Sequence, residues 1–334
     1  MIHNATIQNL ANLHEVKLKN LAPINVIIGE NDSGKTMILK ALYVLSKSVE
    51  EFGRGNDNRS IKEIVADKLY WTFQCDQLGD LVSKDQDNHL KLEAEIDDQH
   101  MMLSFSKSAK NTVSTVTEHV YHREENSIFF PAKEVLSLFN VIKKSRAIDK
   151  EFGFDDTYYD LVLALEKSTQ QGKNFRNFTE SKKLLEKLIN GNIEYKDGKW
   201  LFKKGKMKIS IYSTAEGIKK ISILDRLLTN RYITPGSIIY IDEPESALHP
   251  KAIVEFLDIL SLLSKNNIQI FMATHSFFVL KKLLLIARKE NMSIPVFSIV
   301  KDKVEYSNLN EGMPDNPIVD TSIELYEEEL DLDI

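Results

Sequence analysis

The stretch that most constrains this chain covers residues 24–42. An apolar run ends at Gly29, a polar loop follows, and Gly34-Lys35-Thr36 opens a segment with an apolar, helix-forming pattern. The motif G-x-x-x-x-G-K-[ST] between a strand and a helix is typical of a phosphate-binding loop (P-loop). Its glycines let successive backbone N–H groups converge on a phosphate at the positive end of the helix. The segment therefore predicts an α/β core with a nucleotide site at the end of a buried strand.

The residues of this loop have distinct expected roles. Lys35 is expected to reach the β- and γ-phosphates, and the hydroxyl of Thr36 to complete the coordination of Mg²⁺. Asn31 and Gly34 belong to the loop and are expected to contact the same nucleotide. The alternative is a glycine turn in an ordinary loop, which the flanking strand and helix patterns disfavour. ATP with Mg²⁺ is therefore the predicted ligand pair.

Length and composition exclude several classes of protein. The chain has 334 residues, enough for one large α/β domain with an insertion or for two modest domains, and we favour the first. Hydrophobic residues at 43% and charged residues at 28% are ordinary for a globular protein and exclude disordered and fibrous chains. A net charge of −6 argues against a surface built throughout to neutralise nucleic acid, but it allows a local basic face.

The cysteine count and the apolar runs indicate the compartment. Cys75 is the only cysteine, so an internal disulfide framework is excluded and a reducing cytoplasm is expected. The N-terminal residues do not have the pattern of a signal peptide, and no uninterrupted apolar run reaches the about 18 residues of a membrane helix. We therefore expect a soluble cytoplasmic protein with no membrane partner.

Short segments with alternating apolar residues indicate strands around the P-loop. Residues 2–20 predict one or two strands beside it. Residues 69–73, 90–96, 100–105 and 111–120 alternate in the same way. We expect these segments to form an antiparallel meander, which would be a second, β-rich lobe against the nucleotide site.

The middle of the chain has a different pattern. Residues 127–130 predict a short strand that a proline stops, and residues 132–137 are expected to begin a helix. Residues 149–190 are polar, helical in pattern and poor in β-branched side chains, which predicts a helical lobe inserted into the core. Residues 193–210 alternate around Asp197-Gly198, a strong signal for a hairpin. The lysines of this predicted hairpin are Lys196, Lys199, Lys203, Lys204, Lys206 and Lys208.

Two carboxylates follow a second buried strand. Residues 237–241 are almost entirely apolar and lead into Asp242 and Glu243, which predicts a central parallel strand whose carboxyl end faces the ligand crevice. Asp242 is expected to hold the Mg²⁺ ion through its water shell, and Glu243 to act as general base toward the attacking water. When this segment is taken alone, the alternative is a buried strand that merely ends in an acidic turn.

A histidine occupies the equivalent position after the next predicted strand. Residues 268–274 are largely apolar and lead into His275, with Thr274 and Ser276 on either side of it. A neutral imidazole there can donate to a γ-phosphate oxygen or orient the water. A lone histidine at a strand end is usually structural. Here a crossover helix over residues 250–263 is expected to place the strand beside the one that carries Asp242.

Small hydroxyl residues and a glycine open another predicted helix after residue 211. Ser213, Thr214, Glu216 and Gly217 precede an apolar helical pattern, which predicts a second helix N-terminus able to bind an anion. An ordinary N-cap is the alternative for this segment.

The order of the motifs resembles that in the ABC-class ATPase heads of the SMC, RecF and OLD-nuclease kind. The resemblance covers residues 1–45 and 205–300, and the middle matches only through residues 130–134. Residues 242–250 look most like the small standalone ATPases of bacterial anti-phage systems, such as the Septu, retron and PARIS types. In chain order the motifs are the P-loop, residues 213–217, residues 238–244, residues 246–249 and His275.

The resemblance implies a fold and an assembly. The implied fold class is α/β, a P-loop NTPase of the ABC-ATPase head type with a mixed sheet core, a β-rich lobe and an inserted helical lobe. In such heads two subunits enclose two nucleotides. Residues 246–249 would form the loop that crosses the interface. The residues that would contact the γ-phosphate of the opposite subunit are Ser213, Thr214, Glu216 and Gly217.

This chain departs from that pattern at three places. They are the signature (residues 213–217), the interface loop (residues 246–249) and the lid loop, which in those families joins the core to the helical lobe and corresponds here to residues 130–134. The usual signature serine corresponds to Ser213 in one register and to Ala215 in another, and His249 stands where aspartate is usual. Within the resemblance, the chain divides into residues 1–130 with the P-loop and the β lobe, and residues 131–210 with the helical lobe and hairpin. Residues 211–334 would complete the ATPase core and end in an acidic tail. Candidates for the lid glutamine are Gln74, Lys133 and Glu134.

The function that the resemblance implies is ATP hydrolysis coupled to a partner. The chain would form a homodimer or higher homo-oligomer around two ATP molecules and regulate a separately encoded effector, expected to be a nuclease, in anti-phage defence. No acidic cluster of a fused nuclease follows His275, which favours a separate effector. The acidic tail is either a docking surface for a basic partner or a solvated face. Its acidic residues are Glu324, Glu327, Glu328, Glu329, Asp331 and Asp333.

Other functional classes remain open at this point. A RecF-like or SMC-like DNA-binding repair ATPase would use the hairpin lysines and Lys143, Lys144 and Arg146 on phosphates. The net negative charge and the absence of a sustained heptad pattern argue against it. A third class is a nucleotide-gated scaffold with negligible turnover, and a transporter head is the least favoured because the signature is degenerate.

Overall fold

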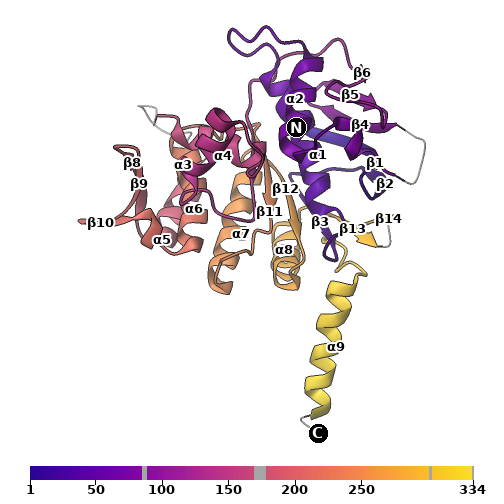
Figure 1. Cartoon of the computed structure of the whole chain (residues 1–334). Coiled ribbons are helices and arrows are strands. Elements are labelled where there is room, and N and C mark those ends of the chain that lie inside the picture. The colour runs from indigo at the N-terminus through magenta and orange to yellow at the C-terminus, as the bar shows by residue number, and fades with distance from the viewer. Residues whose placement is uncertain (85–88, 169–177, 301–302, 333–334) are drawn as a thin grey trace.

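The computed structural model describes residues 1–84, 89–168, 178–300 and 303–332. Figure 1 shows a central sheet flanked by helices, a second sheet beside the first helices of the chain, and a lobe of helices and short strands. Within the described residues the central sheet has six strands in the order β14-β13-β3-β12-β11-β7. β14 is antiparallel to β13, and the other neighbouring strands are parallel. The strands are β3 (Ile24–Gly29), β7 (Ser127–Phe130), β11 (Ile238–Asp242), β12 (Gln269–Thr274), β13 (Pro295–Val300) and β14 (Lys303–Asn308).

The central sheet is buried on both faces. Along β3, Ile24, Val26 and Ile28 belong to one hydrophobic core and Ile27 to a second, because successive side chains of a strand point to opposite faces. The first core also contains helix side chains, among them those of α6 (Glu216–Thr229), α7 (Pro250–Ser264) and α8 (Phe277–Glu290). The second contains side chains of α1 (Lys35–Glu51) and α2 (Ile61–Phe73).

An antiparallel sheet forms the β-rich lobe. Among the described residues it has five strands in the order β2-β1-β4-β5-β6, and α1 contacts strands of both this sheet and the central sheet. The strand predictions for residues 2–20, 90–96 and 100–105 are confirmed. Strand structure within residues 111–120 is limited to β6. The strands are β1 (Ile2–Leu10), β2 (Leu13–Leu18), β4 (Leu90–Ile96), β5 (Gln99–Phe105) and β6 (Thr115–Val116).

The strand predicted at residues 69–73 is wrong, because these residues end helix α2. Ser60 starts this helix as a capping box: its hydroxyl accepts the N–H of Glu63 at 3.3 Å, and the Glu63 carboxylate accepts the N–H of Ser60 at 2.7 Å. Val65 and Leu69 are both buried and lie one helical turn apart. The helical spacing of apolar residues begins before residue 69, so the five residues 69–73 taken alone gave a misleading strand-like pattern.

The inserted lobe combines helices with a small sheet. The predicted hairpin is confirmed: β8 and β9 pair across Asp197-Gly198, whose φ angles of 50° and 75° suit a two-residue hairpin turn. β10 adds a third strand to this sheet. Of the predicted helical stretch 149–190, residues 169–177 lie outside the described residues. The elements are α3 (Phe139–Lys144), α4 (Asp156–Glu166), α5 (Thr179–Ile189), β8 (Asn192–Lys196), β9 (Lys199–Lys204) and β10 (Met207–Ser210).

The helix predicted to begin within residues 132–137 does not form there, and α3 begins at Phe139. The Glu134 carboxylate accepts the N–H of Ser137 at 3.2 Å and lies 3.3 Å from the ammonium of Lys219 on α6. These contacts hold the segment as a bent loop against a helix that is distant in sequence. The local pattern could not reveal that partner.

The last helix, α9 (Pro317–Leu332), projects from the body of the molecule (Figure 1). It contains most of the predicted acidic tail, and it also exposes Leu325, Tyr326, Leu330 and Leu332. No helix among the described residues combines the length and the apolar composition that crossing a bilayer requires.

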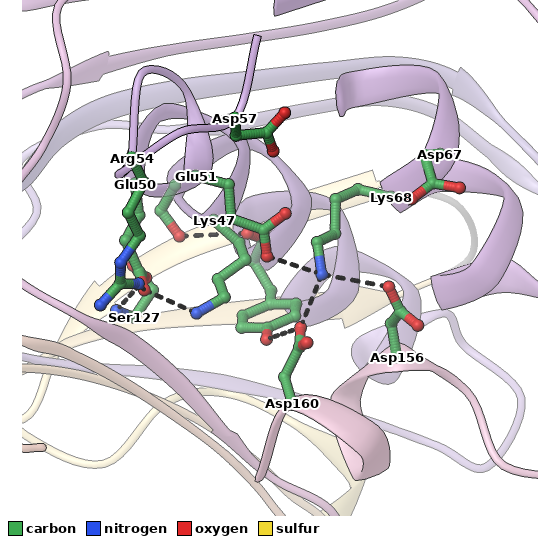
Figure 2. Close-up of polar contacts among 12 residues, drawn as sticks. Lys47, Glu50, Glu51, Arg54, Asp57, Asp67, Lys68, Ser127, Asp156 and Asp160 are labelled. Atoms are coloured by element: carbon green, nitrogen blue, oxygen red, sulfur yellow. Dashed lines mark hydrogen bonds and ion pairs between the residues drawn. The ribbon is translucent and has the colours of Figure 1, made fainter. Parts of the chain in front are cut away.

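A buried group of charged side chains joins α1, α2 and α4 (Figure 2). The ammonium of Lys68 on α2 lies 2.8 Å from Glu51 of α1, and 3.1 Å and 2.9 Å from Asp156 and Asp160 of α4. Tyr43 of α1 donates its hydroxyl to Asp160 at 2.6 Å. Burial opposes the charge on Lys68, but the three carboxylates outweigh it and hold the pKa of Lys68 well above its ordinary value. These contacts attach the helical lobe to the helix that follows the P-loop.

Two further polar contacts hold α1 in place. Lys40 lies 2.7 Å from Asp155 at the start of α4. Along α1, Lys40 is closer in sequence to the P-loop than Glu51, which contacts Lys68. At the other end of α1, Glu50 is 0% exposed and accepts bonds from the Lys47 ammonium at 2.6 Å and from the backbone N–H of Ser127 at 2.7 Å (Figure 2). Because Ser127 begins β7, the helix is attached to the sheet as well as to the lobe.

Replacing Lys68 by methionine should destabilise the protein strongly. The substitution leaves the carboxylates of Glu51, Asp156 and Asp160 buried without their ammonium partner, and breaking a buried pair in this way lowers the free energy of unfolding by about 3–5 kcal/mol. The matched control is Arg59→Met, which removes a cation that is 41% exposed and paired with Asp57 at 2.7 Å. Urea unfolding compares the variants, and equal losses in both would contradict a special role for Lys68.

Candidate functional site

The P-loop leaves the end of β3 and turns into α1 at Gly34. This glycine is the N-cap of α1 at φ 93°, and a Cβ atom there would lie 2.8 Å from Cδ2 of Leu13, so both conformation and space require glycine. The next side chain, Lys35, folds back over the loop. Its Nζ donates to the backbone oxygens of Gly29 at 2.9 Å and Glu30 at 2.6 Å. The predicted strand, loop and helix are all confirmed.

Lys35 is 8% exposed and lies among acidic groups at the end of the sheet. Burial lowers the pKa of Lys35, while the charges of Asp242, Glu243 and Glu245 oppose this shift. Its partners are backbone carbonyls rather than a carboxylate, so the ammonium can turn to a phosphate without leaving an acidic side chain unpaired. Asn31 is exposed on the loop.

Thr36 and Asp242 meet at the start of α1. The Thr36 hydroxyl lies 3.1 Å and 3.0 Å from the two carboxylate oxygens of Asp242, the last residue of β11. Burial raises the pKa of Asp242, and the hydrogen bond from Thr36 works in the opposite direction. A hydroxyl and a carboxylate, both oxygen donors, are the ligands that Mg²⁺ takes when it keeps most of its waters. The residues present therefore fit that ion.

Glu243 and His275 face each other at the same edge. Glu243 follows β11, His275 follows β12, and the two strands are parallel with Asp242 paired to Ala273. The Nδ1 atom of His275 lies 3.5 Å from Oε1 of Glu243. Both side chains are partly exposed, at 46% and 37%, so solvent or a ligand can reach them. The structure thus brings together the carboxylates and the imidazole that the sequence placed on separate strands.

Glu245 is a third acidic residue of this edge, and the sequence analysis did not single it out. Its Oε1 accepts the hydroxyl of Thr274 at 2.7 Å and lies 3.9 Å from Nδ1 of His275. Thr274 also accepts the N–H of Ser276 at 3.0 Å, so these contacts fix the turn that carries His275. The sequence feature that could have indicated this role is the spacing Glu243-Pro244-Glu245, which places a second glutamate two residues after the proposed base.

The predicted signature residues lie around the start of α6. Ser213 ends a short 3₁₀ turn (Ile211–Ser213), and Ser213 and Glu216 are exposed. Thr214 is turned inward, and its hydroxyl donates to the backbone oxygen of Ser210 at 3.1 Å. The N-cap of α6 is Ala215, which offers no side-chain hydrogen bond to the first N–H groups. In the described part of the chain, no hydrogen bond joins these residues to Lys35, Thr36 or Asp242.

The segment after β7 reaches the start of α6. A cavity of about 470 Å³ is lined by Lys133, Glu134, Glu216, Lys219 and Ser246, among others. Two of the three lid candidates, Lys133 and Glu134, therefore lie beside the signature helix. The third, Gln74, is the C-cap of α2. His249 is the N-cap of α7, and its Nδ1 accepts the N–H of Lys251 at 3.3 Å.

A protein-family model matches more than half of the chain. The family described as "AAA domain, putative AbiEii toxin, Type IV TA system" matches residues 50–281. This range contains Glu243, His275 and the start of α6 and begins after the P-loop.

Two curated proteins are similar in sequence. The DNA replication and repair protein RecF of Francisella tularensis subsp. mediasiatica (strain FSC147) is 34% identical over 103 residues, which is 30% of this chain. The chain spans only 29% of the length of that RecF protein. An ATP/GTP phosphatase of Helicobacter pylori (strain ATCC 700392 / 26695) is 23% identical over 331 residues, covering 83% of this chain and 85% of that protein.

Two solved structures have a similar fold. One is the SmcHead bound to the C-winged helix domain of ScpA, with a TM-score of 0.54, 12% identity, and coverage of 93% of this chain and 99% of that chain. The other is the Smc head domain with an extended coiled coil bound to the C-terminal domain of ScpA derived from Pyrococcus furiosus. Its TM-score is 0.55 at 12% identity, with 98% of each chain covered. The chain therefore has the fold of SMC head ATPase domains, as the fold-class prediction stated.

Removing the Lys35 ammonium should weaken nucleotide binding. Lys35→Ala deletes the charged donor that can turn to a phosphate, and a lost charge-assisted hydrogen bond lowers affinity by at least about tenfold. Titration calorimetry with MgATP measures the change. Lys62→Ala, which removes an exposed lysine from α2, is the control and should bind as the wild type does. Wild-type affinity in the Lys35 variant would contradict the P-loop assignment.

Proposed function

The chain belongs to the AAA domain family that matches it, and from that membership we propose that it is a Mg²⁺-dependent ATP hydrolase that dimerises around two ATP molecules and regulates a partner effector. Its type is that of the RecF and SMC ATPases. The observation that carries the proposal is the convergence of Lys35, Thr36, Asp242, Glu243 and His275 at one edge of the central sheet.

The side chains divide the chemistry among them. Lys35 neutralises charge on the β- and γ-phosphates, and the backbone N–H groups at the start of α1 donate to the same oxygens. Thr36 and Asp242 would hold a Mg²⁺ ion, which would supply positive charge to the phosphates. Glu243 accepts the proton of the attacking water as general base. His275, 3.5 Å from Glu243, donates to the γ-phosphate oxygen or orients the water.

The proposed dimer supplies what a single chain leaves incomplete. The exposed Ser213 and Glu216 surround a helix start whose first N–H groups have no side-chain cap, as a γ-phosphate from the opposite subunit would require. Gly217 and the loop of residues 246–249 adjoin this helix start. A homodimer with two enclosed nucleotides, or a larger homo-oligomer built from it, is the assembly we propose.

A separately encoded effector, which we propose to be a nuclease, is the partner in this account. Support comes from α9, which projects from the body (Figure 1). This helix carries exposed Leu325, Tyr326 and Leu330 between acidic side chains. The two similar SMC heads are each described as bound to a domain of ScpA, a second protein. The resemblance of residues 242–250 to standalone anti-phage ATPases supports a role in defence.

A DNA-binding repair ATPase is the second candidate function. The similarity to RecF favours it, and so does the lysine-rich sheet β8–β10. Lys199, Lys203 and Lys204 are exposed on β9, and Lys208 of β10 pairs with Glu194 at 3.4 Å. Exposed lysines on one small sheet can neutralise DNA phosphates even in a chain of net charge −6.

Replacing the proposed general base should separate binding from hydrolysis. Glu243→Gln keeps the size of the side chain but cannot accept a proton, so turnover should fall by about 10²–10⁴-fold while ATP affinity stays near that of the wild type. The bound ATP should then accumulate in a dimer. Phosphate release measures turnover and light scattering measures the dimer. Normal hydrolysis in this variant would exclude Glu243 as the base.

Salt dependence distinguishes the two candidate functions. If DNA is the ligand, duplex DNA should bind with an affinity that falls steeply with salt and should change ATP turnover. Neutralising Lys199, Lys203 and Lys204 together should then reduce the slope of log affinity against log salt by about 3. A turnover rate that DNA leaves unchanged, but that a co-purifying protein alters, would favour the effector function. The matched control neutralises three exposed cations of α8 instead, Lys281, Arg288 and Lys289.

A further inference from the structure

Lys220 is a buried ammonium group that the proposed roles above leave unexplained. Lys220 lies on α6 and is 3% exposed. Its Nζ donates to the backbone oxygen of Glu243 at 2.6 Å. Burial lowers the pKa of Lys220 to about 8, although Glu245, Glu243 and Asp242 oppose the shift. Burying an ammonium group is unfavourable unless it forms hydrogen bonds or ion pairs. We therefore ask what the contact between Lys220 and Glu243 stabilises.

The backbone of Glu243 supplies an answer. Its φ of 49° is in the left-handed region, which is unfavourable for a residue with a side chain and is maintained only when the surroundings hold it. The N–H of Glu243 donates to the backbone oxygen of Ala273 on β12 at 2.9 Å. The carbonyl accepts the N–H of Ser246 at 3.0 Å and the ammonium of Lys220. The Lys220 side chain thus donates a hydrogen bond to the carbonyl of a residue with left-handed backbone angles.

One face of α6 contacts the loop between β11 and α7 (residues 243–249) at two points. Gly217 lies against the loop so closely that a Cβ atom there would be 2.8 Å from the backbone oxygen of Ala247. Lys220 follows Gly217 by three residues, so both lie on the same side of the helix. The first contact fixes the distance between the helix and the loop, and the second fixes the orientation of the Glu243 peptide. Helix α6 therefore contacts both the loop after β11 and the backbone of the proposed base.

We propose that Lys220 is a positioning residue that holds the backbone of Glu243 in its left-handed turn and so aims its carboxylate at the attacking water. The inference rests on the proposed function, because it presumes that Glu243 is the general base. Without the ammonium, the peptide can rotate toward ordinary backbone angles, and the carboxylate moves away from His275. ATP binding depends on Lys35, Thr36 and Asp242, which Lys220 does not touch through a hydrogen bond in the described residues.

Lys220→Met tests the proposal, because methionine keeps an unbranched side chain and lacks the donor. Turnover at saturating ATP should fall at least about tenfold, while the dissociation constant of ATP should change less than about twofold. The matched control is Lys219→Met, on the same helix and 5% exposed. The Lys219 ammonium bonds instead to Ser137 at 2.7 Å and Glu134 at 3.3 Å. Equal turnover in the two variants overturns the proposal.

A second comparison separates positioning from a general loss of structure. In a Glu243→Gln background the base is already gone, so adding Lys220→Met should slow the residual single-turnover rate less than about twofold. A further tenfold loss there shows that Lys220 acts independently of Glu243 and overturns the proposal. If Lys220→Met does not fold, Lys220→Leu, which also lacks a donor, replaces it in both comparisons with the same expected outcomes.

The role of Glu243 and the role of Lys220 are tested by different outcomes. A Glu243→Gln variant that hydrolyses ATP normally contradicts the proposed function itself. A slow Glu243→Gln variant together with a normal Lys220→Met variant contradicts only the role of Lys220. Thermal melting of each variant shows whether a loss of turnover accompanies a loss of fold.

Discussion

The parallel register of β3, β12 and β11 is the constraint on which the rest of the site depends. Asp242 pairs with Ala273, and Thr274 pairs with Ile28, so the three strands end at one edge of the sheet. The P-loop, the carboxylates and His275 all leave from that edge. Because side chains alternate along a strand, a shift of one residue in β11 would turn Asp242 to the opposite face of the sheet. Strand pairing, more than loop composition, therefore assembles the site.

Helix α1 connects this edge to the lobes around it. It begins at Lys35 in the P-loop, and most of its 17 residues are buried because sheets lie on both sides of it. Along its length Lys40 contacts Asp155 and Glu51 contacts Lys68, so the helical lobe is attached to the helix that carries the P-loop. These side chains are largely buried, so breaking the ion pairs would leave carboxylates with little access to water and without their ammonium partner. Ion pairs at two points along α1 thereby join the P-loop helix to the helical lobe.

The errors of the sequence analysis have physical reasons. Residues 69–73 alternate like a strand, but the capping box at Ser60 commits the preceding residues to a helix that continues through them. Residues 132–137 have a helical pattern, but Lys219 holds Glu134 in a loop. Both errors came from short windows, whereas the longer and more regular segments around the P-loop and the buried strands were predicted correctly. Local propensity is weak where a capping or tertiary contact competes with it.

By itself the sequence determined the strand, loop and helix of the P-loop and the carboxylates at the end of β11, because motif spacing and hydrophobic period are local properties. Tertiary structure alone decided that Glu245 reaches Thr274 and that Lys220 bonds to the carbonyl of Glu243. Each of these partners is more than 20 residues away in the chain. Contacts of that kind depend on how helices and strands pack, and no local pattern encodes them.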